Sequence, residues 1–594
     1  MKFFRLPPLM NRLWVHIEPR RRLQFMMLLL LMVFTSFAEI LSVGAVMPFL
    51  GVITVPERIF EHRAAQPLIE FLGITAPDQL LLPVTVLFVA GALLAGTFRM
   101  LMLWFSTRLS FATGADLSNN IYRRTLYQPY AVHVARNSSE VIAAISTKTN
   151  SVIYSTLLPS LNLISSIVML IAILTVLLSV NPEVAITAFL GFASIYAIVI
   201  YNVRRHLRRN SECIARESTQ VLKCLQEGLG GIRDVLLHGS QTTYCAAYRG
   251  ADLPMRRAQG GNAFISLSPR FAMEAFGMAL IACLAYVLTQ QPGGVAGAIP
   301  VLGTLALGAQ RLLPILQQAY AAWAHIKGGQ DALRDTLKLL DQPMPDYACK
   351  PASAPMKFRR EIRLENVSFQ YAPDAPWVLR NFSLTIRRGA RIGFVGTTGS
   401  GKSTLLDIVM GLLFPEQGVL KIDDQVLDHS NQRAWQAHIA HVPQAIYLSD
   451  STITENIAFG IPPDQINYER VQLAAQHAQL AELIEGWPQK YDTFVGERGV
   501  RLSGGQRQRI GIARALYRQA DVIIFDEATS ALDNETERAV MEAIDGLSKE
   551  LTILIIAHRL TTIRNCDQVV DLSHQPSIAG KHESTVTSDA RVYP

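Results

Sequence analysis

Charge and cysteine are both scarce in this sequence of 594 residues. Asp, Glu, Lys and Arg make up 17% of it, whereas about 25% is usual in a soluble protein. Apolar residues make up 50%, and the mean hydropathy is +0.22. This balance excludes an intrinsically disordered chain and argues against a wholly soluble one. Charge is almost absent from residues 150–203 but normal in residues 356–572, so we expect one part built for lipid and another for water.

The six cysteines form no CxxC pair and show no zinc-ligand spacing. A disulfide framework or a metal site is therefore the weaker interpretation, and we expect buried free thiols. The net charge of +7 and the pI near 9.0 are compatible with nucleic-acid binding. The basic residues are concentrated instead in loops beside long apolar runs, which indicates membrane topology and no nucleic-acid partner.

Six apolar stretches are long enough to cross about 30 Å of hydrocarbon at 1.5 Å per residue. The first is too long for a cleavable signal peptide, contains Glu39, and is followed by no small-residue cleavage site. We therefore predict an all-α, six-helix transmembrane domain over residues 23–341. Its spans are expected near residues 23–53, 81–112, 153–180, 183–203, 262–289 and 296–325.

Basic residues in the loops predict the orientation of the spans. Residues 54–80 contain two basic residues, and the connections 179–183 and 290–295 contain none. The even-numbered loops are much richer and are therefore predicted to be cytoplasmic, together with both termini. Their basic residues are Arg123, Arg124, Arg136 and Lys148 in residues 113–152, and Arg204, Arg205, Arg208, Arg209, Arg216, Lys223, Arg233, Arg249, Arg256 and Arg257 in residues 204–261.

Amphipathic patterns flank the predicted spans. The spacing of Leu222, Leu225, Leu229 and Ile232 predicts that the membrane helices extend into the cytoplasmic loops as a stalk. Residues 1–22 mix large apolar side chains with Lys and Arg, which predicts an interfacial helix on anionic lipid. A second amphipathic segment, residues 60–74, lies in the first outer loop, where an ordinary loop helix is an equal alternative.

A proline-rich linker, residues 342–357, separates the membrane part from a different pattern. Short β-branched runs alternate with helices over residues 358–573, which predicts an α/β P-loop NTPase domain with a largely parallel sheet, followed by a polar tail, residues 574–594. Between the expected strand 391–395 and helix 404–413 stands a GxxxxGK[ST] motif, Gly396-Thr397-Thr398-Gly399-Ser400-Gly401-Lys402-Ser403. Its backbone N–H groups would surround phosphate oxygens, with Lys402 on the β- and γ-phosphates and Ser403 on Mg²⁺.

Two apolar runs end in side chains suited to phosphate hydrolysis. Residues 522–527 end in Asp526, predicted to hold Mg²⁺, and Glu527, the predicted general base. Residues 553–557 lead to His558, which is expected at the same sheet edge, close to the γ-phosphate. A second helix start suited to phosphate lies at Leu502-Ser503-Gly504-Gly505-Gln506. One such site is enough for a monomeric P-loop enzyme, so the second predicts a partner subunit.

Together these motifs resemble the nucleotide-binding domain of ABC transporters, and nearly the whole chain resembles an exporter half-transporter. The resemblance implies ATP hydrolysis coupled to transport, with ATP and Mg²⁺ as cofactors. It also implies a homodimer in the bacterial cytoplasmic (inner) membrane with its nucleotide-binding domain in the cytoplasm. Gly496-Glu497-Arg498-Gly499 resembles the X-loop of exporters, and residues 228–234 resemble a region that contacts the opposite cassette.

The resemblance assigns roles residue by residue. Tyr371 matches the aromatic that stacks on adenine, Gln444 the Q-loop, Ser530-Ala531-Leu532-Asp533 the D-loop, and His558 the switch histidine. The residues expected to bind ATP are Tyr371, Gly396, Thr397, Thr398, Gly399, Ser400, Gly401, Lys402, Ser403, Thr404, Ser503, Gly504, Gly505, Gln506 and Asp533. Those expected in catalysis are Glu527, His558, Lys402 and Gln444, and those expected on Mg²⁺ are Ser403, Gln444 and Asp526.

Charged residues inside the spans bear on the cargo: Glu39, Arg99, Arg270, Glu274 and Arg311. A basic residue at mid-bilayer costs about 2.5–3.5 kcal/mol on insertion scales, so each is expected to face a partner or a water-filled cavity. Arg270 and Glu274 are four residues apart and could pair with each other, whereas the other two arginines have no such neighbour. Arginines on three spans, doubled in a dimer, predict a cavity for a phosphate- or pyrophosphate-bearing amphiphile.

The membrane domain also resembles the PglK-type lipid-linked oligosaccharide flippases. The resemblance is carried by residues 37–50 and 60–74, by Pro269-Arg270 with Glu274, and by Arg311 with Pro314. It implies a polyprenyl-tail contact at Leu68, Phe71 and Leu72, and a pyrophosphate contact at Arg99, Arg270 and Arg311. The function expected is ATP-driven flipping of a polyprenyl-pyrophosphate-linked oligosaccharide.

Two other functions are weighed against this expectation. A general lipid or multidrug exporter would need an apolar, aromatic-rich cavity, and three arginines count against a cavity of that kind. An ATP-gated channel or a regulatory membrane protein would use hydrolysis only to switch conformation, whereas Glu527 and His558 favour turnover.

Overall fold

The computed structural model describes residues 8–44, 49, 52, 60, 76–180, 182–289, 312–349, 354–527, 532–545, 550–556, 565–573 and 592–593. Contacts divide the chain into two compact units. The first consists of Met1–Gln128 and Arg136–Met344, and the second of Pro129–Ala135 and Pro345–Pro594.

The first unit is helical. Its helices include α1 Pro8–His16, α2 Pro19–Gly44, α6 Leu81–Leu126, α8 Ser138–Ala143, α9 Thr149–Val152, α10 Leu158–Val180, α11 Pro182–Gly230, α12 Ile232–Leu237, α13 Gln241–Thr289 and α15 Gln330–Leu340. Among the described residues, three helical segments are long and apolar enough to cross a membrane: Pro19–Leu41, Leu81–Leu126 and Ser138–Thr175. The expected spans at 183–203, 262–289 and 296–325 include residues outside the described set or without described side chains, and they stay predictions.

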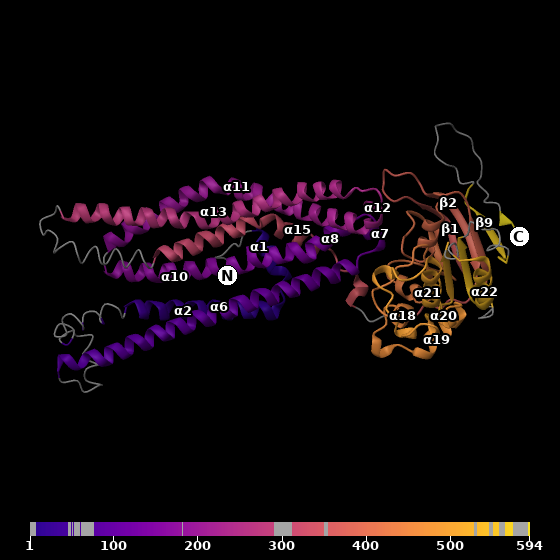
Figure 1. The fold of residues 1–594 in the computed structure, drawn as a ribbon, viewed down its shortest axis with the longest axis horizontal. Helices are drawn as coiled ribbons and strands as arrows, with labels where there is room; N and C mark the ends of the chain where they lie inside the picture. The colour runs from indigo at the N-terminus through magenta and orange to yellow at the C-terminus, as the bar shows by residue number, and fades with distance from the viewer. Residues whose placement is uncertain are drawn as a thin grey trace. The chain divides into compact units, whose positions relative to one another are not determined.

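Helices α11 and α13 run side by side in Figure 1 and pack against each other. Each has 49 residues, which is about 74 Å at 1.5 Å per residue, more than twice the hydrocarbon thickness of about 30 Å. The predicted extension of the membrane helices beyond the spans is therefore confirmed for this pair. Helix α13 continues through Pro254 and Pro269, neither of which can donate a backbone hydrogen bond.

Contact of the N-terminal helix with anionic lipid stays a prediction, but one face of its described part packs against protein. Leu13 of α1 is only 1% exposed, because it packs with Leu117, Ile121 and Leu337 of the helical unit. Polar contacts add to this packing, since Arg12 and His16 both bind the carboxylate of Asp341 just after α15. Helix α1 is thus attached to protein. The amphipathic segment 60–74 lies, apart from residue 60, outside the described residues.

The described cysteines differ in part from the expectation of buried thiols. Cys213, Cys224 and Cys566 are free and half-buried, whereas Cys245 is free and exposed. Within the described ranges, no group of three or more His, Cys, Asp or Glu side chains could hold a metal ion.

The second unit contains two sheets in its described part. The first has the strand order β2-β1-β4-β5 and is antiparallel, and the second has the order β10-β9-β3-β8-β7-β6. In the second sheet all neighbours are parallel except β10 and β9. The strands are β1 Glu361–Phe369, β2 Leu379–Arg387, β3 Arg391–Val395, β4 Gln417–Ile422, β5 Gln425–Val426, β6 Ile439–Val442, β7 Val522–Asp526, β8 Thr552–Ile556, β9 Gln568–Asp571 and β10 Val592–Tyr593.

Helices accompany these sheets. They are α7 Tyr130–Val134, α16 Lys402–Val409, α17 Gln432–Gln436, α18 Ile453–Ile457, α19 Tyr468–His477, α20 Ala481–Glu485, α21 Gly504–Tyr517 and α22 Asn534–Asp545. Strands β7 and β8 are buried on both faces: Ile524 and Leu554 lie in one hydrophobic cluster, and Ile523 and Ile555 in the other. Burial of both faces explains why these strands are continuous apolar runs without alternation.

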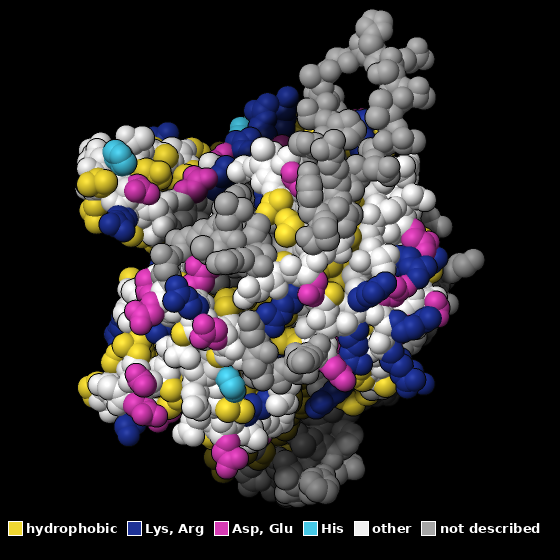
Figure 2. Space-filling model, turned by 90° about the vertical axis from the view of Figure 1, so that its right-hand side faces the viewer, with side chains coloured by type: hydrophobic (Ala, Val, Ile, Leu, Met, Phe, Trp, Pro, Cys, Tyr) yellow, Lys and Arg dark blue, Asp and Glu magenta, His cyan; other side chains and the backbone are white. Residues whose placement is uncertain are grey.

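The expected α/β domain is confirmed, with one addition. Strand β3 has the predicted bounds, and β7 and β8 lie within one residue of theirs. The helix expected over 404–413 begins two residues earlier and ends four residues earlier, as α16 Lys402–Val409. The antiparallel sheet was not predicted, because buried residues alternate with half-buried ones in β1 and with exposed ones in β2, so that neither strand reads as an apolar run. In the space-filling view, Lys and Arg are interspersed with Asp and Glu, so the surface shown carries both signs of charge (Figure 2).

Candidate functional site

The parallel sheet brings the phosphate-binding loop and the acidic pair to one edge. Strand β8 lies between β3 and β7, and parallel strands have their carboxyl ends at the same edge. The loop that follows β3 and the carboxylates at the end of β7 are therefore separated by a single strand. The sequence alone could not show that these groups are so close, since more than 120 residues lie between Lys402 and Asp526.

Two glycines give the loop between β3 and α16 its shape. Gly401 has φ +91° and directly precedes α16, and Gly396 has φ +146°. A Cβ atom on Gly401 would lie 3.1 Å from the carbonyl oxygen of Val378, and one on Gly396 would lie 2.8 Å from the Oγ of Ser400. A side chain at either position would therefore be strained by the backbone conformation and would displace a neighbouring atom.

Polar groups in the loop are arranged for a phosphate. The Lys402 Nζ donates to the carbonyl oxygens of Gly396 and Thr397, at 2.8 and 2.9 Å. The Oγ of Ser400 is buried without a hydrogen-bond partner. An ammonium group held by neutral carbonyls and an unsatisfied hydroxyl both gain from an anion in the loop. The residues present therefore fit the phosphates of ATP.

Tyr371 lies beside the same helix start. Its hydroxyl is 2.9 Å from the Oγ1 of Thr404, the third residue of α16. The Tyr371 side chain is 52% exposed, although Phe369 packs against it edge to face. A ring with a free face next to the phosphate loop is what stacking on a base requires. The structure thus places Tyr371 beside the loop, and its stacking on adenine stays a prediction.

At the end of β7, Asp526 lies close to Ser403, another of the predicted magnesium ligands. Burial and the charge of Glu527 raise the pKa of Asp526, while a hydrogen bond with Ser403 and the charge of Lys402 act in the opposite direction. Burial, followed by the charge of Asp526, raises the pKa of the neighbouring Asp407 to about 6. This local excess of negative charge fits a divalent cation held by oxygen ligands.

Glu527 is held in an unusual backbone conformation. Its φ is +51°, and its N–H donates to the carbonyl of Ile556 on β8 at 3.1 Å. The Nε2 of Gln444 donates to its Oε2 at 2.7 Å. Non-glycine residues in the left-handed region cost free energy and are frequent at functional sites. Gln444 and Glu527, which are far apart in the sequence, are therefore a hydrogen-bonded pair.

The second predicted phosphate site is a well-capped helix start. The Oγ of Ser503 accepts from the N–H of Gln506 at 3.2 Å, and the Gln506 side chain accepts from the N–H of Ser503 at 2.8 Å. This capping box fixes the first turn of α21. Gly504 and Gly505 lie in that turn, and Ser503 is exposed. An exposed helix start with small residues leaves room for an anion.

Of the D-loop and the switch histidine, the structure describes only Leu532 and Asp533. Asp533 accepts hydrogen bonds from the backbone and side chain of Thr536, which hold its pKa below the usual value. Leu532 is buried at 5% exposure. Ser530, Ala531 and His558 lie outside the described residues, so the position of the predicted switch histidine stays a prediction.

Two of the charged residues in the expected spans have partners in the structure. Arg99 has no carboxylate four residues away in sequence, but its Nη2 lies 2.6 Å from the Oε1 of Glu39 on another helix, α2. Arg270 donates from Nε to the Oε1 of Glu274 at 2.8 Å, the pairing that the sequence left open. Arg311 and the predicted tail contacts Leu68, Phe71 and Leu72 lie outside the described residues.

A short helix that sequence reasoning missed also belongs to the second unit. Helix α7 lies between the helices of the first unit in sequence but is grouped with the nucleotide-binding domain. Burial, then the charge of Asp407 on α16, raises the pKa of Tyr130. The only local signal is Pro129 before a run of five residues, which is too short for a periodicity argument.

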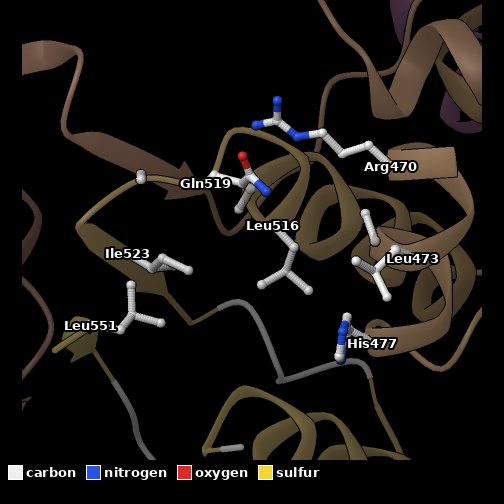
Figure 3. Close-up of a pocket in the computed structure, with 10 residues that line it drawn as sticks. Arg470, Leu473, His477, Leu516, Gln519, Ile523 and Leu551 are labelled. Carbon is white, nitrogen blue, oxygen red and sulfur yellow. The ribbon is translucent and has the colours of Figure 1, made fainter. Parts of the chain in front are cut away.

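A separate cavity of about 260 Å³ lies at the opposite sheet edge (Figure 3). Ile523 near the start of β7 and Leu551 just before β8 line it, together with Leu473 and His477 of α19 and Leu516 of α21. Residues at the amino ends of β7 and β8 cannot take part in chemistry at their carboxyl ends, so this cavity is distinct from the candidate nucleotide site.

The fold and the site define a P-loop nucleotide-binding domain fused to a helical transmembrane domain. Family models confirm both parts: the ABC transporter model matches residues 379–530, and the ABC transporter transmembrane region model matches residues 23–291. The chain belongs to the ABC transporter family, as a fused half-transporter of the exporter type. It is accordingly a multi-pass membrane protein that couples ATP hydrolysis to transport.

Several curated relatives carry the name ATP-dependent lipid A-core flippase. The protein from Ralstonia nicotianae is 28% identical over 523 residues, 85% of each chain. That from Chromohalobacter salexigens is 31% identical over 404 residues, 68% of this chain and 69% of the relative. That from Pasteurella multocida is 30% identical over 463 residues, 77% and 78%.

A solved structure is similar over almost the full length. It is described as a bacterial Atm1-family ABC exporter with ATP bound, and the similarity covers 93% of both chains with a TM-score of 0.73 and 25% identity. This likeness confirms the exporter architecture.

Proposed function

We propose that the chain flips a polyprenyl-pyrophosphate-linked oligosaccharide across the bacterial cytoplasmic membrane, as a homodimer with its nucleotide-binding domains in the cytoplasm. The coarser function, ATP-driven export of a lipid, is supported by relatives that are named as flippases of lipid A-core. The choice of a pyrophosphate-linked oligosaccharide as the cargo is supported by one observation at Arg270. Its hydrogen bond to Glu274 uses Nε, and its side chain is 62% exposed, so both Nη groups remain for a phosphate.

Hydrolysis follows from the residues at the sheet edge. Lys402 and the glycine loop bind the phosphates, and Tyr371 receives the base. Glu527 accepts a proton from the attacking water, and Gln444 holds the Glu527 carboxylate in position through their 2.7 Å hydrogen bond. Ser403, Asp526 and Gln444 would hold Mg²⁺, which neutralises charge on the phosphates. Ser503 and its glycines would complete the site of the partner chain, which requires a dimer.

A second cargo, lipid A-core, is favoured by the names of the relatives. A multidrug exporter is the less favoured alternative, because the charged pairs Glu39–Arg99 and Arg270–Glu274 place ionic groups within or beside the expected spans.

The test is flipping in proteoliposomes with three fluorescent cargoes: lipid-linked oligosaccharide, lipid A-core and a hydrophobic drug. Wild type is compared with Glu527→Gln, which is expected to bind ATP and to lose flipping. ATP-dependent flipping of the oligosaccharide lipid supports the proposal. If only lipid A-core is flipped, the cargo is lipid A-core and the proposed oligosaccharide lipid is wrong. If Glu527→Gln flips the oligosaccharide lipid at the wild-type rate, the proposed mechanism is wrong.

A further inference from the structure

A groove runs between α2 and α6 in the helical unit. Its volume is about 560 Å³, and most of its lining is apolar. Several of these side chains are large and exposed, among them Met27 at 59%, Trp104 at 51% and Phe105 at 46%. The lining residues are Arg21, Gln24, Met27, Leu28 and Leu31 on α2, and Trp104, Phe105, Arg108, Leu109 and Ala112 on α6.

The two arginines of this groove differ in their contacts. The Nε of Arg21 donates to Asp116 at 2.7 Å, and its Nη1 donates to Gln24 at 3.1 Å. Within the part of the chain that the structure describes, the contact of Arg108 is with Trp104, whose ring centre lies 5.2 Å from the guanidinium. The charge of Arg21 is thus balanced within the protein, whereas Arg108 offers a full positive charge and its fork of donors to the groove.

The depth of Arg108 places it near the membrane surface. Helix α6 begins at Leu81, so Arg108 lies about 40 Å along the helix at 1.5 Å per residue. The hydrocarbon layer is about 30 Å thick. With the orientation predicted from the loop charges, this end of α6 reaches the cytoplasmic leaflet. The ring of Trp104 beside it is the residue type typical of the membrane interface.

The geometry points to a binding site for an anionic phospholipid of the cytoplasmic leaflet, separate from the transported cargo. Its phosphate binds the guanidinium of Arg108, and an acyl chain lies along Leu31 and Phe105 towards the membrane centre. Charge complementarity selects this occupant, because among the described residues the groove presents the cation of Arg108 without a carboxylate partner and an apolar path continuing from it. A zwitterionic lipid brings its own cation and gains less, and a free phosphate leaves the apolar path uncovered.

The test measures the fluorescence of Trp104, which lines the groove and is quenched by brominated lipid bound there. Full-length protein is placed in nanodiscs that contain phosphatidylglycerol or phosphatidylcholine, each brominated near the carbonyl end of its acyl chains. The Trp104 signal is the wild-type fluorescence minus that of Trp104→Phe. We expect brominated phosphatidylglycerol to occupy the site about fivefold more than phosphatidylcholine, since one basic residue near an anionic surface contributes about 1 kcal/mol.

Variants separate the site from general attraction to an anionic membrane. Arg108→Gln is expected to remove the preference, and Arg108→Lys to keep most of it. Arg205→Gln removes the same charge from an exposed position on α11 and is expected to keep the preference. Glycerol phosphate in solution is expected not to compete. Equal quenching by the two lipids in wild type would overturn the inference without any variant, as would a preference that survives in Arg108→Gln.

Discussion

Glu39 of α2 and Arg99 of α6 form an ion pair with an N–O distance of 2.6 Å. A second pair, Arg21 with Asp116, joins the same two helices at 2.7 Å. The pairs lie 18 residues apart along α2 (39 minus 21) and 17 along α6 (116 minus 99), which is about five helical turns. Two pairs with matching spacing fix the antiparallel register of this hairpin. Glu39 is 9% exposed at its side chain, so its pairing with Arg99 compensates a charge that is largely shielded from water.

The first prediction separates the structural role of Arg99 from cargo binding. Arg99→Gln removes the cation that is paired with the largely buried Glu39 carboxylate, so we expect lower thermal stability in detergent as well as lower transport. The double variant Glu39→Gln with Arg99→Gln removes both charges and should recover most of the stability. Transport by the double variant is then decisive. A loss supports a role in binding an anionic cargo, whereas wild-type flipping would show that Arg99 only pairs with Glu39.

The second prediction concerns a buried pair outside the expected spans. Lys148 is only 4% exposed, and its Nζ lies 2.7 Å from the Oδ2 of Asp335 on α15. Asp335→Asn leaves a buried ammonium group without its counter-charge, a change that costs about 3–5 kcal/mol. The control is Lys338→Gln, which removes the exposed partner of the same carboxylate and should cost less than about 1 kcal/mol. Thermal melting of the full chain in detergent measures both.

The same pair predicts a pH dependence. Burial alone would raise the pKa of Asp335, but hydrogen bonds from Lys148 and Lys338 more than reverse this and lower it. A lowered pKa in the folded state means that this stabilisation is present above the unfolded value near 3.8 and is lost as the pH falls through the lower folded value. The difference in melting temperature between wild type and Asp335→Asn should therefore be constant from pH 7 to 5 and shrink below about pH 4. A difference that grew on acidification would contradict the assignment.

The nucleotide-binding domain was predictable because its chemistry is encoded locally. The glycines before Lys402, the apolar strand before Asp526 and the capping box at Ser503 each require particular residues at fixed spacing. The hydrogen bond between Gln444 and Glu527 was not predictable in the same way. It depends on β6 and β7 lying side by side in the sheet, which no local pattern states.

The membrane part was less predictable for a physical reason. In lipid, apolar residues fit almost any helix face, so hydropathy gives spans without giving partners. Glu39 and Arg99 were both recognised as costly charges, but their pairing depends on the α2–α6 register. Leu13 of α1 looked like a lipid-facing residue because an amphipathic helix buries the same face against protein or lipid.

The third prediction tests the shape of the phosphate loop. Gly401→Ala places a Cβ 3.1 Å from the Val378 carbonyl oxygen at a φ of +91°, so the loop must move and ATP affinity should fall about tenfold or more. The matched control is Gly460→Ala, where φ is +82° but no atom lies within 4 Å of the added Cβ. It should lose roughly 1–2 kcal/mol of stability through the backbone conformation and keep its ATP affinity. Titration with a fluorescent ATP analogue measures both, and equal affinities would rule out a steric requirement at Gly401.

The fourth prediction concerns the pair that positions the general base. Gln444→Ala removes the donor 2.7 Å from the Glu527 carboxylate, so this carboxylate is less well oriented towards the attacking water. We expect kcat to fall about tenfold, less than the loss of about 10²–10⁴ expected from Glu527→Gln. Gln444→Glu should be worse than Gln444→Ala, because it places a second carboxylate beside Glu527. The control is Gln425→Ala on the exposed strand β5, and steady-state ATPase assays over a range of ATP concentrations separate kcat from KM. A Gln444→Ala variant with normal kcat would show that Gln444 is not needed to orient Glu527, whose backbone N–H is also held by the carbonyl of Ile556 on β8.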